Sequence, residues 1–192
     1  MITDYKTYKE YVHKDLIAYQ VEKLSLYRYC YDDCLRFQLR LRRIEYLLNT
    51  STDYSFRRIV CIWLQIINHR LATRLGFSIP HNVFGPGLCI VHYGTIVVSP
   101  KAQIGSNCRI HPSTSIGDYN GAPTIGDNVY IGPGAKLFGP IKIGNNVSIG
   151  ANAVVNKSFG DNIILAGVPA KIVNECPSLE IGVFPSTIIL NN

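Results

Sequence analysis

Two histidines, His92 and His111, lie in or beside a repetitive stretch of the chain that ends at Val155. His92 stands in the run His92-Tyr93-Gly94, six residues before Val98, where the repeat would otherwise place an aliphatic side chain. A neutral imidazole can take a proton from an alcohol while the alcohol oxygen attacks a thioester. We therefore interpret His92 as a general base, with a buried structural histidine as the alternative. His111 is a second catalytic candidate, and a surface position near a corner would suit it equally well.

A six-residue repeat sets the elements that must position these histidines. Aliphatic residues recur every six residues, with one step of nine, at Val98, Ile104, Ile110, Ile116, Ile125, Ile131, Leu137, Ile143, Ile149 and Val155. Neither a helix nor an isolated strand has this period, so the pattern indicates a stacked repeat. In most hexads a glycine follows the aliphatic residue, and glycine, asparagine or aspartate allows a tight turn, so that three hexads close one coil. The repeat thus predicts a mainly β protein in which parallel coils form a β-helix.

The N-terminal part of the chain has a different composition. Residues 1–75 contain no glycine or proline, and their patterning predicts helices over residues 5–19, 24–48 and 55–75. We expect a helical segment at 1–76, a β-helix domain at 77–173 and a tail at 174–192 that the pattern does not place. One apolar face of the third helix is expected to cover the open end of the coils, and it consists of Ile59, Ile62, Trp63, Ile66, Ile67, Arg70 and Leu71. The extra residues at 117–124 predict a loop that bulges from one corner.

Charge and cysteine content narrow the classes of function. The net charge is +6, and residues 1–75 carry most of it, with 13 Lys and Arg against 8 Asp and Glu. A solvated helical face explains these cations, although contact with an anionic glycan or at most a peripheral membrane contact is the alternative. Nucleic-acid binding is not expected, because no known module accompanies the basic residues. The six cysteines have no metal-ligand spacing, so we expect no metal and reduced thiols in a cytoplasmic protein. Residues 1–6 lack an apolar core, so we expect no signal peptide.

Three segments resemble the serine acetyltransferase family, and more closely its short members found in capsule and exopolysaccharide gene sets. They are residues 86–98 (PGLCIVHYGTIVV), 122–136 (APTIGDNVYIGPGAK) and 166–171 (AGVPAK). The resemblance implies a left-handed parallel β-helix, a homotrimer, acetyl-CoA as co-substrate, and His92 as the general base. It also implies coenzyme contacts at Pro133, Ala151, Asn156, Lys157 and Lys171.

The chain also departs from that family at positions that bear on the acceptor. The family has an aspartate where this chain has Val91, a second active-site histidine where it has Ala122, and a longer helical domain. Without that aspartate, the ammonium group of serine would lose a charged partner. We therefore expect transfer of an acetyl group to a sugar hydroxyl in surface-polysaccharide synthesis. The alternatives are serine O-acetylation, and a β-helix scaffold without catalysis.

Overall fold

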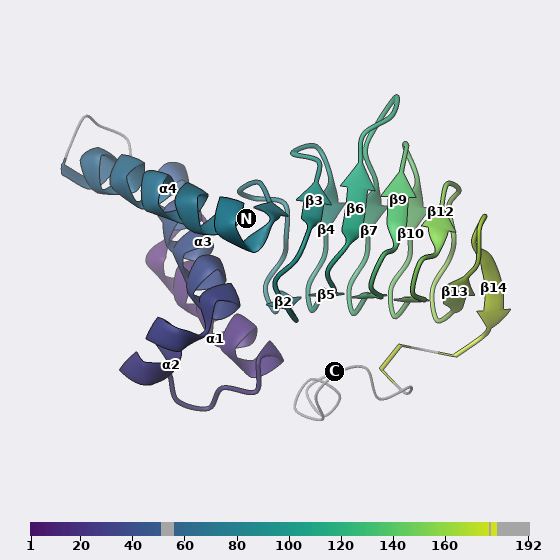
Figure 1. Ribbon diagram of the computed structural model, residues 1–192, viewed down its shortest axis with the longest axis horizontal. Coiled ribbons are helices and arrows are strands. Elements are labelled where there is room, and N and C mark those ends of the chain that lie inside the picture. Colours follow the sequence, from purple (N-terminus) through teal and green to yellow (C-terminus); the bar gives the residue numbers. More distant parts are fainter. Residues whose placement is uncertain (51–55, 177, 180–192) are drawn as a thin grey trace.

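The computed structural model describes residues 1–50, 56–176 and 178–179. Four helices form one end of the molecule, and a stack of short strands forms the rest (Figure 1). The helices are α1 (Tyr5–Ala18), α2 (Leu26–Tyr31), α3 (Asp33–Thr50) and α4 (Phe56–Leu75). Within the described part of the chain, no helix is both long and apolar enough to cross a membrane.

The helix boundaries match the predicted ones except in the second helix. The expected helix over residues 24–48 is divided into α2 and α3, because Asp32 has an extended backbone and interrupts it. The Asp32 side chain then accepts a hydrogen bond from the Leu35 N–H at 3.0 Å, which caps the start of α3. Helix α4 ends at Gly76, whose φ of 81° favours glycine. The expected start of the third helix at Ser55 lies outside the described residues.

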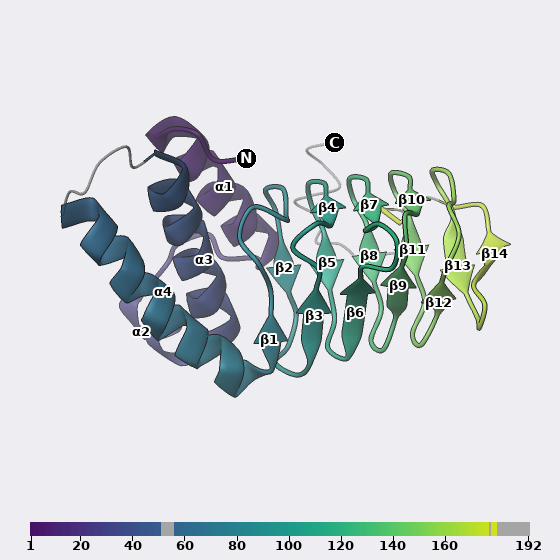
Figure 2. The same ribbon diagram turned by 90° about the horizontal axis from the view of Figure 1, so that it is seen from above.

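In the part of the chain that the structure describes, fourteen short strands form three sheets. The sheets run along the faces of the stack (Figures 1 and 2). The first sheet contains β1 (Phe77–Ser78), β3 (Ile96–Val98), β6 (Thr114–Gly117), β9 (Lys136–Phe138) and β12 (Val154–Val155). The second contains β4 (Gln103–Ile104), β7 (Thr124–Ile125) and β10 (Lys142–Ile143). The third contains β2 (Cys89–Ile90), β5 (Arg109–Ile110), β8 (Tyr130–Ile131), β11 (Ser148–Ile149), β13 (Ile164–Ala166) and β14 (Lys171–Asn174). All pairs are parallel except β13 with β14, so the predicted parallel β-helix is confirmed.

The hexad residues stack directly on one another inside the coils. In the third sheet the register places Ile90 on Ile110, Ile110 on Ile131, and Ile131 on Ile149, and all four side chains are fully buried. At one corner, asparagines with φ near 56° form a ladder through their side-chain amides, with N···O distances of 2.8–2.9 Å: Asn107, Asn128, Asn146 and Asn162. Aliphatic stacking inside and amide bonding at the corner together fix the register of the coils.

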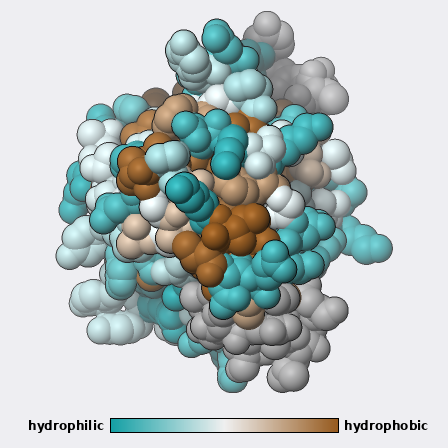
Figure 3. Space-filling view, turned by 90° about the vertical axis from the view of Figure 1, so that its right-hand side faces the viewer, coloured by the Kyte–Doolittle hydropathy of each residue, from teal (hydrophilic) through white to brown (hydrophobic). Residues whose placement is uncertain are grey.

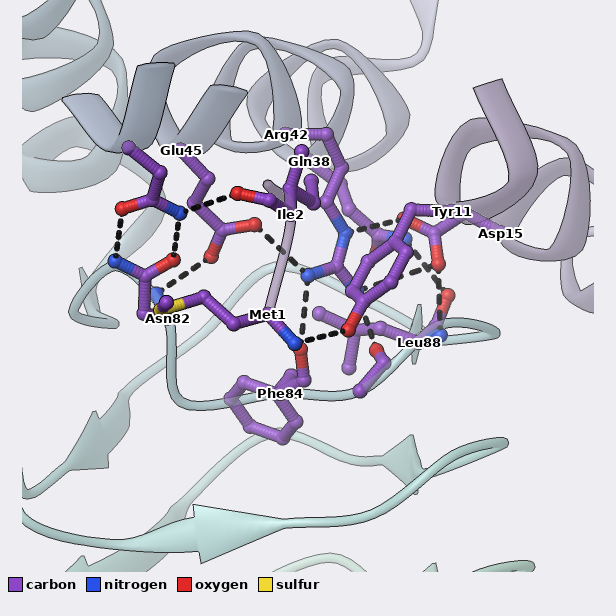
Figure 4. Close-up of polar contacts among 12 residues, drawn as sticks. Met1, Ile2, Tyr11, Asp15, Gln38, Arg42, Glu45, Asn82, Phe84 and Leu88 are labelled. Atoms are coloured by element: carbon purple, nitrogen blue, oxygen red, sulfur yellow. Dashed lines mark hydrogen bonds and ion pairs between the residues drawn. The ribbon is translucent and has the colours of Figure 1, made fainter. Parts of the chain in front are cut away.

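Side chains of the helical segment take the place of a strand along the free edge of the first coil. Arg42 is fully buried and donates hydrogen bonds to Asp15, to Glu45 and to the carbonyl oxygens of Phe84 and Gly85 (Figure 4). Asp15 accepts from the N–H groups of Gly87 and Leu88 at 2.8 and 3.0 Å. These bonds satisfy edge groups of the coil that would otherwise be buried without partners.

The expected role of the apolar face of α4 is wrong for most of its residues. Leu71, at the C-terminal end of that face, joins the core of the coils together with Ala72 and Leu75. The side chains of Ile59, Ile62, Trp63 and Ile66 are exposed instead. The pattern misled because α4 is apolar on both sides, and periodicity alone does not tell which side is covered.

The opposite end of the stack also presents apolar side chains. Val168, Ile172 and Val173 of the last coil are exposed. Figure 3 looks onto this end, and an apolar patch faces the viewer. The antiparallel strand β14 lies here, beside β13 at the edge of the third sheet.

Candidate active site

His92 projects from the first coil because two extra residues are inserted at its corner. The register pairs Ile90 with Ile110 and Ile96 with Thr114, so five residues of the first coil span the corner that three residues span in the second. His92 and Tyr93 lie in this insertion, and both are exposed. Ile90 is the residue that fills the inward position of that coil. The idea that His92 replaces an aliphatic residue of the repeat is therefore wrong, and its side chain is available for chemistry.

A cavity of about 770 Å³ brings His92 together with side chains of the helical segment. Its charged lining residues come from α2, from the α2–α3 junction and from β5: Arg28, Asp32, Asp33 and Arg109. Tyr27, Tyr31 and Tyr93 line the same cavity, and the rings of Tyr27 and Tyr31 stack with centroids 4.4 Å apart. One imidazole, two carboxylates and two guanidinium groups thus share one space.

The carboxylates are held by the helix boundary that separates α2 from α3. Asp32 caps α3, as described above, and Asp33 forms an ion pair with Arg36 one turn later. Arg28 donates to the Tyr19 carbonyl oxygen at 3.3 Å. Because these contacts are local to the helical segment, the charged lining depends on how that segment docks on the first coil.

Arg109 and two buried thiols, those of Cys34 and Cys89, line the same cavity as His92. The Arg109 Nη1 atom lies 3.7 Å from the Cys89 Sγ atom. Burial raises the pKa of Cys89 to about 11 and that of Cys34 to about 12, so neither thiol is ionised near neutral pH. The two thiols therefore do not compete with His92 as the group that removes a proton.

His111 lies one coil away from His92 and does not line the cavity. Burial, with the neighbouring charges of Arg109 and His92, lowers the pKa of His111 to about 4. Its ring packs on Tyr130 with centroids 5.0 Å apart, and its buried Nε2 atom has no hydrogen-bond partner among the described residues. A catalytic role for His111 stays a prediction, and its geometry favours a packing role.

Two of the expected coenzyme positions continue the corner from which His92 projects. Gly134 N–H donates to Pro112 O, and Asn152 N–H donates to Pro133 O, so Pro112, Pro133 and Ala151 mark this corner in successive coils. With about 4.8 Å between coils, Pro133 lies about 10 Å and Ala151 about 14 Å along the stack from the first coil. Asn156 and Lys157 lie at the next corner, after β12, and Lys171 begins β14; all three are exposed.

The sequence interpretation missed the residues contributed by the helical segment. Asp32, Asp33 and Arg28 are about sixty residues away from His92 along the chain, and nothing in the hexad pattern refers to them. The signal that was present is the pair Asp32-Asp33 inside an otherwise helical stretch. Adjacent aspartates there indicate a helix boundary.

Comparison with known proteins agrees with this fold. Residues 122–157 match the family model described as bacterial transferase hexapeptide (six repeats). The fold agrees with this match, which lies within the stacked coils.

The relatives narrow the class further. A serine acetyltransferase of Mycobacterium tuberculosis is 37% identical over 101 residues, which are 50% of this chain and 44% of that protein. A Neisseria gonorrhoeae serine acetyltransferase, solved in complex with serine, has a TM-score of 0.68 and 27% identity, and the match covers 88% of this chain and 70% of that one. A serine acetyltransferase solved with CoA gives a TM-score of 0.68 at 26% identity over 88% and 71% of the two chains.

These similarities are to serine acetyltransferases, the family that the three segments of the sequence resemble. They do not support the narrower expectation of a capsule or exopolysaccharide member, because the relatives are named serine acetyltransferases. The chain spans less than half the length of the curated relatives that it matches.

The expectation of a sugar hydroxyl as acceptor is contradicted by these relatives and is wrong. It depended on Val91, which lines the cavity where the family has a carboxylate. Asp32 and Asp33 supply carboxylates to the same cavity from the helical segment. The cavity therefore contains carboxylates although Val91 replaces the aspartate next to the histidine.

Proposed function

We propose that this protein transfers the acetyl group of acetyl-CoA to the hydroxyl of L-serine. The observation that carries the proposal is the single cavity that contains His92, two carboxylates and two guanidinium groups. Free serine carries a hydroxyl, an ammonium and a carboxylate, and each has a chemical counterpart among these side chains. The named activity of the relatives supports the same assignment.

In this proposal His92 removes the proton from the serine hydroxyl while the oxygen attacks the thioester carbonyl carbon. The carbon–sulfur bond then breaks, and the CoA sulfur leaves with the proton that the imidazole had taken. Serine becomes O-acetylserine, and the imidazole returns to its neutral form. Asp32 or Asp33 binds the serine ammonium group, and Arg28 or Arg109 binds its carboxylate, so that the hydroxyl is presented to His92.

The coenzyme arm is placed along the corner marked by Pro133 and Ala151. Small side chains and backbone atoms at this corner let a thin chain approach the coils closely, and it leads directly to His92. Lys157 and Lys171 are exposed cations, and we assign them to the phosphates of the nucleotide end. Pro133 and Ala151 are exposed in a single chain. We therefore also propose a homotrimer in the cytoplasm, in which a neighbouring copy covers the coenzyme.

The test of the function is release of CoA thiol from acetyl-CoA with matched acceptors. L-Serine is compared with β-hydroxypropionate, which lacks the ammonium group, with ethanolamine, which lacks the carboxylate, and with glucosamine. The proposal predicts that L-serine has the highest kcat/KM, and that each truncated acceptor is roughly 10-fold to 150-fold poorer because a charged group of the site loses its partner. Equal turnover of L-serine and ethanolamine would contradict it, as would no thiol release with any acceptor.

The ammonium contact is tested separately by Asp32→Asn. Asparagine caps a helix about as well as aspartate, so the start of α3 is kept while the negative charge is lost. We expect the KM for L-serine to rise at least tenfold and the KM for acetyl-CoA to stay unchanged. Asp4→Asn is the matched control, because Asp4 caps α1 through the Thr7 N–H and does not line the cavity. If both variants behave alike, and Asp33→Asn is also without effect, the ammonium site lies elsewhere.

A further inference from the structure

Helix α4 has an exposed apolar side that neither the fold nor the proposed reaction uses. Five large apolar side chains, one or two for each turn of the helix, are between 50% and 78% exposed: Phe56, Ile59, Ile62, Trp63 and Ile66. The opposite side of the helix packs inward, with Cys61 against α3 and Leu71, Ala72 and Leu75 against the coils. In Figures 1 and 2 α4 runs along the outer edge of the helical segment, so this side faces away from the molecule.

The charges on α4 decide what can cover this side. The helix contains four arginines, Arg57, Arg58, Arg70 and Arg74, and no acidic residue. All four are exposed, and they lie toward the two ends of the helix. Arg57 also donates to the Thr50 hydroxyl and lies over the Tyr46 ring of α3, so Arg70 and Arg74 are the cations that bear most on this question. Soluble proteins rarely expose a large contiguous apolar patch unless it binds a partner. An apolar patch with cations near it matches a lipid surface, in which an anionic headgroup layer covers an apolar acyl region.

A second copy of the chain fits these charges poorly. In an antiparallel pair centred on Trp63, Arg70 of one copy would approach the end of the other helix that carries Arg57 and Arg58. No carboxylate on either helix would offset that repulsion. An anionic bilayer has the opposite property, because its headgroups attract the arginines while its acyl region accepts the isoleucines, and Trp63 suits the interface between the two.

We propose that the outer side of α4 docks on an anionic lipid surface and holds the protein at the membrane peripherally. The inference is independent of the proposed acetyl transfer. Docking by one amphipathic helix with four cations is reversible and depends on salt, because the electrostatic part is screened as ionic strength rises. The cavity at His92 is lined by residues from the end of α1 to the start of α3 and by the first coils, and by no residue of α4, so docking leaves it accessible.

Trp63 is the only tryptophan of the chain and reports directly on this surface. Its emission is recorded as vesicles are added, either of phosphatidylcholine alone or of phosphatidylcholine with phosphatidylserine, together with co-sedimentation and acrylamide quenching. The proposal predicts a blue shift and protection from acrylamide with the anionic vesicles only, and loss of both at high salt. Removing two cations in the variant R70Q/R74Q should weaken binding about fivefold for each charge.

Matched variants separate the docking surface from general stickiness. The variant I62S/I66S keeps Trp63 as reporter and removes apolar area, so binding should fall roughly tenfold or more. The variant K6Q/K9Q removes two cations from α1 and should change binding less than R70Q/R74Q does.

Three results would overturn the proposal. The first is the absence of any emission change with anionic vesicles, and the second is equal binding to neutral vesicles. The third combines two observations: Trp63 is already shielded from acrylamide without lipid, and the mass of the protein in solution is lower in I62S/I66S than in wild type. A second copy of the chain would then be the occupant of this surface.

Discussion

The hydroxyl group of Tyr19 bonds to both backbone groups of Ile90, two residues before His92. It donates to the Ile90 carbonyl oxygen at 2.8 Å and accepts from the Ile90 N–H at 3.2 Å. Tyr19 follows the last turn of α1, and Ile90 lies in β2, whose other edge pairs with β5. The helical segment therefore holds the strand that leads into His92, in addition to lining the cavity.

The variant Tyr19→Phe tests this contact. Removal of the hydroxyl leaves a buried N–H and a buried carbonyl oxygen without partners, which should lower the free energy of unfolding by about 1 to 3 kcal/mol. We also expect kcat to fall about tenfold while the KM for acetyl-CoA stays the same, because the path to His92 shifts and the coenzyme corner does not. Tyr29→Phe is the control, since Tyr29 accepts from Arg40 within the helical segment and does not touch the coils. Equal effects of the two changes on kcat would contradict a positioning role for Tyr19.

The buried ion pairs of Arg42 are expected to dominate the docking of the helices on the coils. Arg42→Ala leaves Asp15 and Glu45 buried without their cation, so the free energy of unfolding should fall by about 3 to 5 kcal/mol. Arg43→Ala, next to it, removes a partly exposed contact with the rings of Tyr8 and Tyr46 and should cost about 1 kcal/mol or less. Urea denaturation followed by circular dichroism measures both. A loss below about 1 kcal/mol for Arg42→Ala would show that the network does not anchor the two parts.

The environment of His111 predicts a dependence of stability on pH. Its pKa is lowered to about 4 in the folded protein, so between about pH 6.5 and pH 4 the unfolded chain binds more protons. The contribution of neutral His111 to the free energy of unfolding is therefore complete above about pH 6.5 and is lost as the pH falls toward 4. Partial exposure reduces it to about 1 to 2 kcal/mol.

Denaturation of wild type and His111→Gln at pH 7, 5.5 and 4.5 measures this contribution. The difference in unfolding free energy between pH 7 and pH 4.5 should be smaller in the variant. His13→Gln, on the surface of α1, is the control for the loss of an imidazole. Parallel curves for wild type and His111→Gln would mean that His111 is protonated as easily in the folded protein as in the unfolded chain.

The fold was largely predictable from the sequence, and the acceptor site was not. The hexads record a local period, so the coils, their stacking and the corner loop followed from spacing alone. Asp32 and Arg28 reach the cavity only through the docking of α1 and α3 on the first coil, and such long-range contacts leave no periodic signal. His92 was found because it disturbs the repeat, although the insertion that makes it project required the register between Ile96 and Thr114.

The exposed side of α4 illustrates a second limit. Ile59, Trp63 and Leu71 all lie at helical spacing, and the sequence treats them as one apolar face. The structure buries Leu71 and exposes the other two. The positions of apolar residues on a helix can be read from the local sequence. Which of them become buried depends on the angle between α4 and the first coil, which is set at Gly76.

The most direct test of the whole account is kcat for acetyl transfer to L-serine in His92→Ala, measured beside the melting temperature. His92 is exposed in an inserted corner, so its removal should leave the melting temperature within about 2 °C of wild type. Loss of the general base should lower kcat by roughly 10² or more, with little change in the KM for either substrate. A variant that keeps its fold and retains kcat within about threefold of wild type would contradict the assignment of His92, and with it the placing of the reaction in this cavity.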